Sequence, residues 1–236
     1  SVTIYEDAEV AVANSRAIVI GGKGASFLNQ GSITGHLDFG YDGLISLAGN
    51  GTVGSNEGTI LTSSSGSALS LNQGVSLFEN SEGALISSDG FRGAINLRNS
   101  FNGQLINSGT ISSANRTAIY AHTSSSSGSN NQIVITNNET GVIEGETGIY
   151  NIGEDFLDIA NHGTIRGNVG VSVNESSVLT NEKTGLIEAA KIANYTPYAA
   201  LYSRAFGRNG KVSFINRGAI NSTGTAVLGG AYNLNN

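Results

Sequence analysis

Acidic side chains are the residues of this sequence with the clearest catalytic potential. The tightest acidic group is formed by Glu154, Asp155 and Asp158. Glycoside cleavage needs two carboxylates about 5 to 9.5 Å apart, and Ca²⁺ needs several clustered acidic oxygens. Strand alternation would turn Asp158 outward, away from a shared site. A solvated charge cluster therefore explains these residues better than a pair of catalytic carboxylates.

Other common catalytic motifs are also missing. His36, His122 and His162 lie far apart in the sequence, and no Gly-x-Ser-x-Gly phrase supplies a nucleophilic serine. The glycine-rich run around Lys23 is not followed by a helical pattern, so it is not typical of a phosphate-binding loop. We therefore expect no enzymatic activity, no catalytic residue, no metal site and no cofactor.

Three charged residues share one spacing. Glu144, Arg166 and Glu188 each follow a Gly-x-Ile phrase, and consecutive copies are 22 residues apart. Equal spacing predicts equal places in a repeating structure, with the three charges stacked outward and alternating in sign. Arg166 between the two carboxylates would keep both ionised, which disfavours an acid and base pair. We expect each exposed pair to contribute only about 0 to 1 kcal/mol.

The elements that would position these charges repeat along the whole chain. One phrase is Asn, a few residues, then Gly-x-Ile, and it predicts a strand, a tight turn and a second strand. An amide side chain at such a turn can bond to its copy in the next repeat and so form a ladder. The expected ladder residues are Asn29, Asn56, Asn107, Asn161, Asn181 and Asn216, with looser copies of the phrase beginning at Asn80 and Asn137.

A second phrase is a small residue followed by apolar-x-apolar, and it supplies a third strand. Its first apolar residue is Ile18, Leu69, Ile95, Ile119, Ile149, Val171, Leu201 or Val227. It recurs with a mean period of about 26 residues, within the range typical of solenoids. The sequence predicts an all-β, right-handed, three-sheet parallel β-helix of about nine coils, with residues 1–236 as a single domain. These apolar residues and the Ile of each Gly-x-Ile phrase should stack inward.

The third position of the second phrase should face outward. It places Tyr120, Tyr150 and Tyr202 on one outer sheet, with Ser172 between the last two. An exposed aromatic strip would suit adhesion. The alternative is that long loops fold over the rings and cover them.

Two long intervals mark loop insertions, near residues 121–131 and 189–211. The first is rich in Ser, Gly and Asn and has the composition of a flexible loop. The second is rich in Tyr and Arg, which often anchor interfaces. Its candidate partner-binding residues are Lys191, Tyr195, Tyr198, Arg204 and Arg208. The alternative is that these side chains simply pack on the solenoid.

The amino-acid composition limits the classes of partner that the chain could bind. The chain has 236 residues, 33 Gly, one Pro, no Cys and a net charge of −6. It lacks the basic field that nucleic acids require, and it cannot form disulfides. No apolar run is long enough to span a bilayer, and Ser1 does not open a signal peptide, so we expect a mature chain or a segment excised from a longer protein.

These phrases, together with the surplus of Gly, Asn, Ser and Thr, resemble the passenger domain of a bacterial autotransporter of the self-associating adhesin type. The resemblance covers essentially the whole chain and implies a Gram-negative source, display at the cell surface or secretion, and a C-terminal membrane barrel missing here. It implies binding to another copy on a neighbouring cell or to a host surface protein or glycan, in aggregation, biofilm formation or adhesion. A secreted virulence effector that engages a host receptor is one alternative, and a polysaccharide-active β-helix enzyme is the second.

Overall fold

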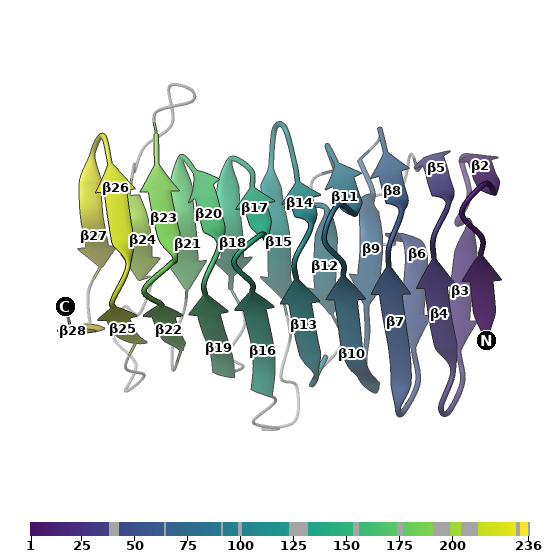
Figure 1. Cartoon of the computed structure of the whole chain (residues 1–236), viewed down its shortest axis with the longest axis horizontal. Helices are drawn as coiled ribbons and strands as arrows, with labels where there is room; N and C mark the ends of the chain where they lie inside the picture. The colour runs from purple at the N-terminus through teal and green to yellow at the C-terminus, as the bar shows by residue number, and fades with distance from the viewer. Residues whose placement is uncertain are drawn as a thin grey trace.

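The fold is described by a computed structural model. It describes residues 1–37, 43–63, 65–90, 92–98, 101–122, 132–152, 156–173, 177–190, 199–203, 212–229 and 232–235. Every regular element in these ranges is a β-strand, and the strands form three parallel sheets stacked along one long axis (Figure 1). No helix in the described ranges is long and apolar enough to cross a bilayer.

Each coil contributes one strand to each sheet. Sheet A contains β1 (Val2–Ile4), β4 (Ser26–Asn29), β7 (Thr52–Asn56), β10 (Val75–Asn80), β13 (Gln104–Asn107), β16 (Gln132–Asn137), β19 (Phe156–Asn161), β22 (Val178–Asn181), β25 (Val212–Asn216) and β28 (Tyr232–Asn235). Sheet B contains β2 (Glu9–Ala13), β5 (Ser32–His36), β8 (Thr59–Thr62), β11 (Leu85–Ser88), β14 (Thr110–Ser112), β17 (Val142–Glu144), β20 (Thr164–Gly167), β23 (Leu186–Ala189) and β26 (Ala219–Ser222). Sheet C contains β3 (Ile18–Gly21), β6 (Gly43–Ala48), β9 (Ser67–Leu71), β12 (Ile95–Arg98), β15 (Thr117–His122), β18 (Thr147–Asn151), β21 (Val169–Val173), β24 (Ala199–Ser203) and β27 (Thr225–Gly229).

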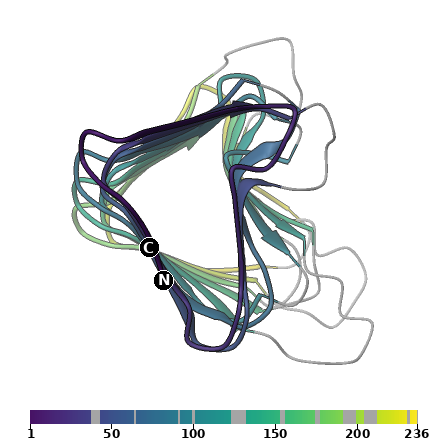
Figure 2. The ribbon, with the colours of Figure 1, turned by 90° about the vertical axis from the view of Figure 1, so that its right-hand side faces the viewer.

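Viewed along the axis, the sheets enclose a three-sided core (Figure 2). The all-β, three-sheet parallel solenoid predicted from the sequence is therefore confirmed. In the two nine-stranded sheets, the first and last strands have a neighbour on one side only. About seven turns are stacked on both sides, slightly fewer than the nine coils expected. The two counts differ at the ends, where each apolar phrase forms a strand that is paired on one side only within the described residues.

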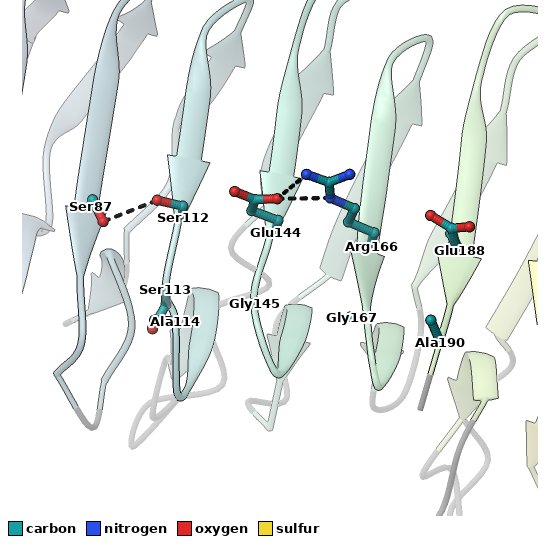
Figure 3. A pocket seen from close by; sticks show the side chains of 10 residues that line it. All are labelled: Ser87, Ser112, Ser113, Ala114, Glu144, Gly145, Arg166, Gly167, Glu188 and Ala190. Atoms are coloured by element: carbon teal, nitrogen blue, oxygen red, sulfur yellow. Dashed lines mark hydrogen bonds and ion pairs between the residues drawn. The ribbon is translucent and has the colours of Figure 1, made fainter. Parts of the chain in front are cut away.

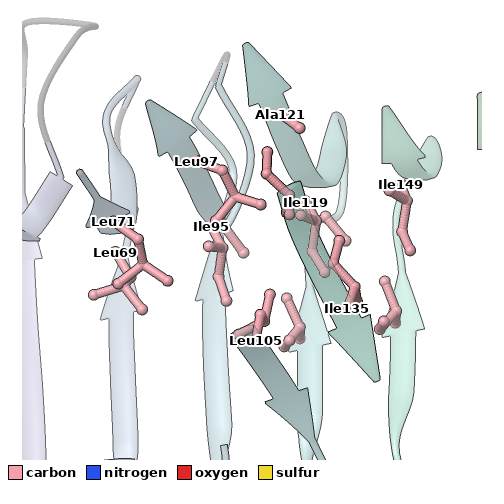
Figure 4. Packing of buried hydrophobic residues seen from close by; sticks show 14 of the residues in the cluster. Leu69, Leu71, Ile95, Leu97, Leu105, Ile119, Ala121, Ile135 and Ile149 are labelled. Carbon is pink, nitrogen blue, oxygen red and sulfur yellow. The ribbon is translucent and has the colours of Figure 1, made fainter. Parts of the chain in front are cut away.

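Two columns of aliphatic side chains fill the core from sheets B and C. In sheet B, Ile143 lies in register with Ile111 on one side and Ile165 on the other. In sheet C, Ile119 pairs with Ile95 and Ile149, and their side chains meet those of sheet A in the interior (Figure 4). The predicted inward positions are confirmed, because all are fully buried except Ile18, Ile220 and Val227 in the end coils. Each such burial contributes about 1.5 to 3 kcal/mol.

One strand escaped the sequence pattern. Ile45 of β6 fills the sheet C column between Ile18 and Leu69. Its phrase begins Gly43-Leu44 instead of with a small residue directly before Ile, so it does not match the motif. Leu44 is fully buried where the other coils bury alanine or glycine.

Buried asparagines form the corner between sheets A and B. From Asn29 to Asn181, the side-chain Nδ2 of each donates to Oδ1 of its copy one coil further on, over 2.7 to 2.9 Å. The column runs through Asn29, Asn56, Asn80, Asn107, Asn137, Asn161, Asn181 and Asn216.

At most corners a glycine follows the asparagine because the chains approach closely there. A Cβ atom on Gly109 would collide with the carbonyl oxygens of Ser81 and Ala84 in the preceding coil. The Asn and the Gly of the phrase thus have different structural roles. The amide links the coils, and the glycine permits their contact.

Candidate functional site

A hollow of about 300 Å³ lies on the outer face of sheet B (Figure 3). One side is a row of polar side chains in register, and the other is a row of small residues near the turn toward sheet C. The polar row is Ser87, Ser112, Glu144, Arg166 and Glu188, and the remaining lining residues are Ser113, Ala114, Gly145, Gly167 and Ala190. The hollow exists because these small side chains leave space beside the longer charged ones.

The structure places Glu144, Arg166 and Glu188 on one face and on consecutive strands. Arg166 Nε donates to Glu144 Oε2 at 2.7 Å, and Arg166 Nη2 contacts the same oxygen. Arg166 and Glu188 form no ion pair in the described structure, so the alternation of charges produces one pair and not two. The Arg166 side chain is about half exposed, and the pair should contribute only about 0 to 1 kcal/mol.

The acidic cluster around Asp158 and the three histidines lie on separate surfaces. Asp158 is half-buried in sheet A, in register with Val134 and Val178, while Glu154 and Asp155 lie outside the described residues. His36 ends a sheet B strand, His122 ends a sheet C strand, and His162 lies at the A–B corner. Within the described ranges, no three His, Asp or Glu residues come close enough to hold a metal ion.

The outer face of sheet C carries an aromatic and basic cluster, called here the Tyr120 cluster, of Arg92, Tyr120, His122 and Tyr150. Tyr120 and Tyr150 are strand partners, with ring centroids 5.7 Å apart and planes tilted by 41°. The His122 ring stacks on Tyr120 at 6.1 Å, and the Arg92 guanidinium carbon lies 5.6 Å from the Tyr120 centroid. All four side chains are half-buried, so the rings are neither fully covered nor fully exposed.

The three tyrosines do not form one continuous strip. Ser172 lies between Tyr150 and Tyr202 in register and is buried. Tyr202 is half-buried and makes no ring contact within the described residues. The aromatic surface is therefore the Tyr120–Tyr150 pair, with Tyr202 standing apart.

Burial and neighbouring charges shift two pKa values in the Tyr120 cluster. The pKa of Tyr120 is raised, chiefly by burial, with a smaller opposing effect from Arg92. The pKa of His122 is lowered by burial and then by the positive charges of Arg92 and Arg98. At neutral pH, Tyr120 therefore keeps its proton and His122 is mainly uncharged, so the two guanidinium groups carry the positive charge of this face.

The candidate partner-binding residues of the long insertion, Lys191, Tyr195, Tyr198, Arg204 and Arg208, lie outside the described residues. Most of the two insertions near 121–131 and 189–211 does as well. The candidate sites within the described residues therefore lie on the sheets.

Two members of the Tyr120 cluster were not among the predicted site residues. His122 follows Tyr120 by two positions, so strand alternation could have placed it on the same face. Arg92 could not have been found in this way, because it precedes its strand and reaches Tyr120 from a turn in the preceding coil.

Comparison with known proteins gives no match for this chain. No family model, no curated protein and no solved structure matches the chain.

Proposed function

We propose that this protein is an extracellular adhesin or self-associating module of a Gram-negative bacterium, displayed on the cell surface or secreted as part of an autotransporter passenger. The observation that carries the proposal is the half-exposed Tyr120 cluster on the outside of a solenoid whose interior is packed with side chains. Rigid aromatic rings and arginine are the side chains that most often anchor interfaces. The partner is another copy of the chain or a host surface protein or glycan.

The proposal concerns binding and not catalysis. Glu144, the best placed carboxylate in the sheet B hollow, accepts two contacts from Arg166. Its carboxylate is therefore already engaged by a guanidinium group and is not free to act on a substrate. A reducing-sugar assay with a panel of polysaccharides should therefore detect no cleavage. Release of reducing ends that depends on Glu144 would contradict this part of the proposal.

We further infer that the solenoid winds in the right-handed sense expected from the repeat. Crossovers between parallel strands of one sheet are right-handed in nearly all known cases. The long axis then presents each outer column of side chains as a straight row, with neighbours about 4.8 Å apart. Such rows suit attachment to extended or repetitive partners.

Attachment of beads coated with the protein tests the proposal. Coated beads should aggregate or attach to epithelial cells, and the double substitution Tyr120→Ser and Tyr150→Ser should reduce that attachment severalfold by removing the ring pair. Tyr5→Ser is the matched control, because Tyr5 is 71% exposed and lies outside the Tyr120 cluster. Failure of wild-type beads to attach to each other or to cells would contradict the proposal, and so would an equal loss in the control.

A further inference from the structure

Sheet C differs from the rest of the molecule in its charge. None of its nine strands contains Asp or Glu, although the chain as a whole carries a net charge of −6. The charged residue in these strands is Arg98, which is in register with His122. Arg92 adds a second guanidinium above Tyr120. A positive patch on an acidic protein favours a negatively charged ligand at this face.

The rings of the Tyr120 cluster give that patch a flat apolar component. Tyr120 and Tyr150 lie side by side across two coils, and His122 extends the surface beyond Tyr120. The faces of such rings pack against the C–H groups of a sugar. A small inorganic anion would need the guanidinium groups but would have no use for the rings.

Polar groups without partners flank the rings. Asn96 is in register with Tyr120 and is 0% exposed, yet neither its Nδ2 nor its Oδ1 has a hydrogen-bond partner. The hydroxyl groups of Ser70 and Ser172, in the same outer column, are also buried and unpartnered. Because these side chains are only 0 to 2% exposed, a ligand on the outer face cannot reach them. The accessible part of the column around the rings is therefore confined to Tyr120 and Tyr150, which fits a short ligand.

We propose that the outer face of sheet C binds an acidic sugar, meaning a pyranose that carries a carboxylate or a sulfate. Arg92 and Arg98 bind the anionic group, and the Tyr120 and Tyr150 rings pack on the sugar face. This inference names the ligand class for the face used in the proposed function, and it rests on that function for its extracellular setting.

A nucleic acid would also offer anions and flat rings, but the rest of the molecule disfavours it. A long polyanion would have to pass over an acidic protein, whereas a short acidic sugar meets only the local patch. Positively charged ligands are disfavoured by both guanidinium groups. The acidic sugar therefore matches both the charge and the rings of this face.

Isothermal titration calorimetry of the purified chain tests this inference with four probes. They are a heparin-derived tetrasaccharide, which carries sulfate, a tetragalacturonate, which carries carboxylate, a neutral cellotetraose and a short oligothymidylate. We expect binding of at least one acidic sugar and none of the neutral one, and the preferred acidic probe identifies the anionic group. Failure of both acidic sugars to bind, equal binding of cellotetraose, or tighter binding of oligothymidylate would overturn the inference.

Two arginine variants show where the sugar binds. Arg92→Ala should weaken binding about tenfold or more, because it removes a charge-assisted contact. Arg166→Ala removes an arginine of sheet B and should leave the affinity unchanged. An equal loss in both variants would indicate non-specific attraction and would contradict the site. Circular dichroism confirms that both variants keep the strand content of the wild type.

The two proposals fail in different ways. If coated beads attach but no acidic sugar binds to the chain, the ligand class is wrong and the surface-binding function stands. If an acidic sugar binds but beads attach neither to each other nor to cells, the adhesive function is wrong and the sugar site stands.

Discussion

Removing one asparagine from the middle of the corner ladder should be far more damaging than removing one from its end. Asn107 is fully buried, accepts a hydrogen bond from Asn80 and donates one to Asn137. Asn107→Ala loses both bonds, at a net cost of about 1 kcal/mol each. It also leaves Asn137 Oδ1 buried without its donor, which costs about 1 to 3 kcal/mol more. We therefore expect the free energy of unfolding to fall by about 3 to 5 kcal/mol, a large share of a typical total.

Asn29 is the matched control, because it stands at the start of the ladder. The preceding coil places Ile4 beside it, so its Oδ1 has no hydrogen-bond partner. Asn29→Ala loses one ladder bond and leaves the buried Asn56 Oδ1 without its donor, but it also removes the Asn29 Oδ1 that is already unsatisfied. The last two effects nearly cancel, so we expect a loss of about 0 to 2 kcal/mol.

Urea unfolding followed by circular dichroism measures both variants. Coils of a solenoid interact mainly with their neighbours, so the position of Asn107 in the middle of the stack should also broaden or split its transition. Equal loss of unfolding free energy in Asn29→Ala and Asn107→Ala would refute the reasoning. It would show that a position in the middle of the ladder stabilises the fold no more than a position at its end.

Other perturbations test the core and the surface. Ile143→Ala should lower the free energy of unfolding by about 2 to 5 kcal/mol, because it leaves a cavity in the sheet B column. Glu144→Ala should change it by about 0 to 1 kcal/mol, and that change should shrink further in high salt, because the pair with Arg166 is exposed. Because folding lowers the pKa of His122, its contribution to stability is fully present above the unfolded value near 6.5 and is lost as the pH falls through the folded value. Thermal unfolding between pH 7.5 and 5 should therefore depend less on pH in His122→Gln than in the wild type, and His162→Gln is the corresponding surface substitution for comparison.

The repeat made most of the fold predictable. Strands of a solenoid pair with their own copies, so a phrase that recurs along the sequence also specifies which residues become neighbours. The register of Ile143 and Ile165 follows directly from their equal spacing. The β6 strand was missed because Leu44 replaces the small residue of the phrase, although the neighbouring Ile45 fills the same column.

The site was less predictable for two physical reasons. Arg92 reaches Tyr120 through a long side chain from a turn, and neither strand alternation nor repeat spacing specifies such a reach. The pairing of Arg166 with Glu144 and not with Glu188 depends on rotamers, because both carboxylates occupy equivalent positions on neighbouring strands. A repeat specifies the position of each Cα atom, whereas contacts between long polar side chains depend on their rotamers.

Blocking one face at a time tests the proposed function most directly. The chain has no cysteine, so His122→Cys on sheet C and Ser112→Cys on sheet B each create a single thiol, on neighbouring strands of one coil. Each thiol is coupled to a bulky polyethylene-glycol maleimide, and attachment of coated beads is compared before and after labelling. We expect labelling at residue 122 to abolish attachment and labelling at residue 112 to leave it unchanged. Attachment that survives the label on sheet C but is lost with the label on sheet B would contradict the assignment of the binding face.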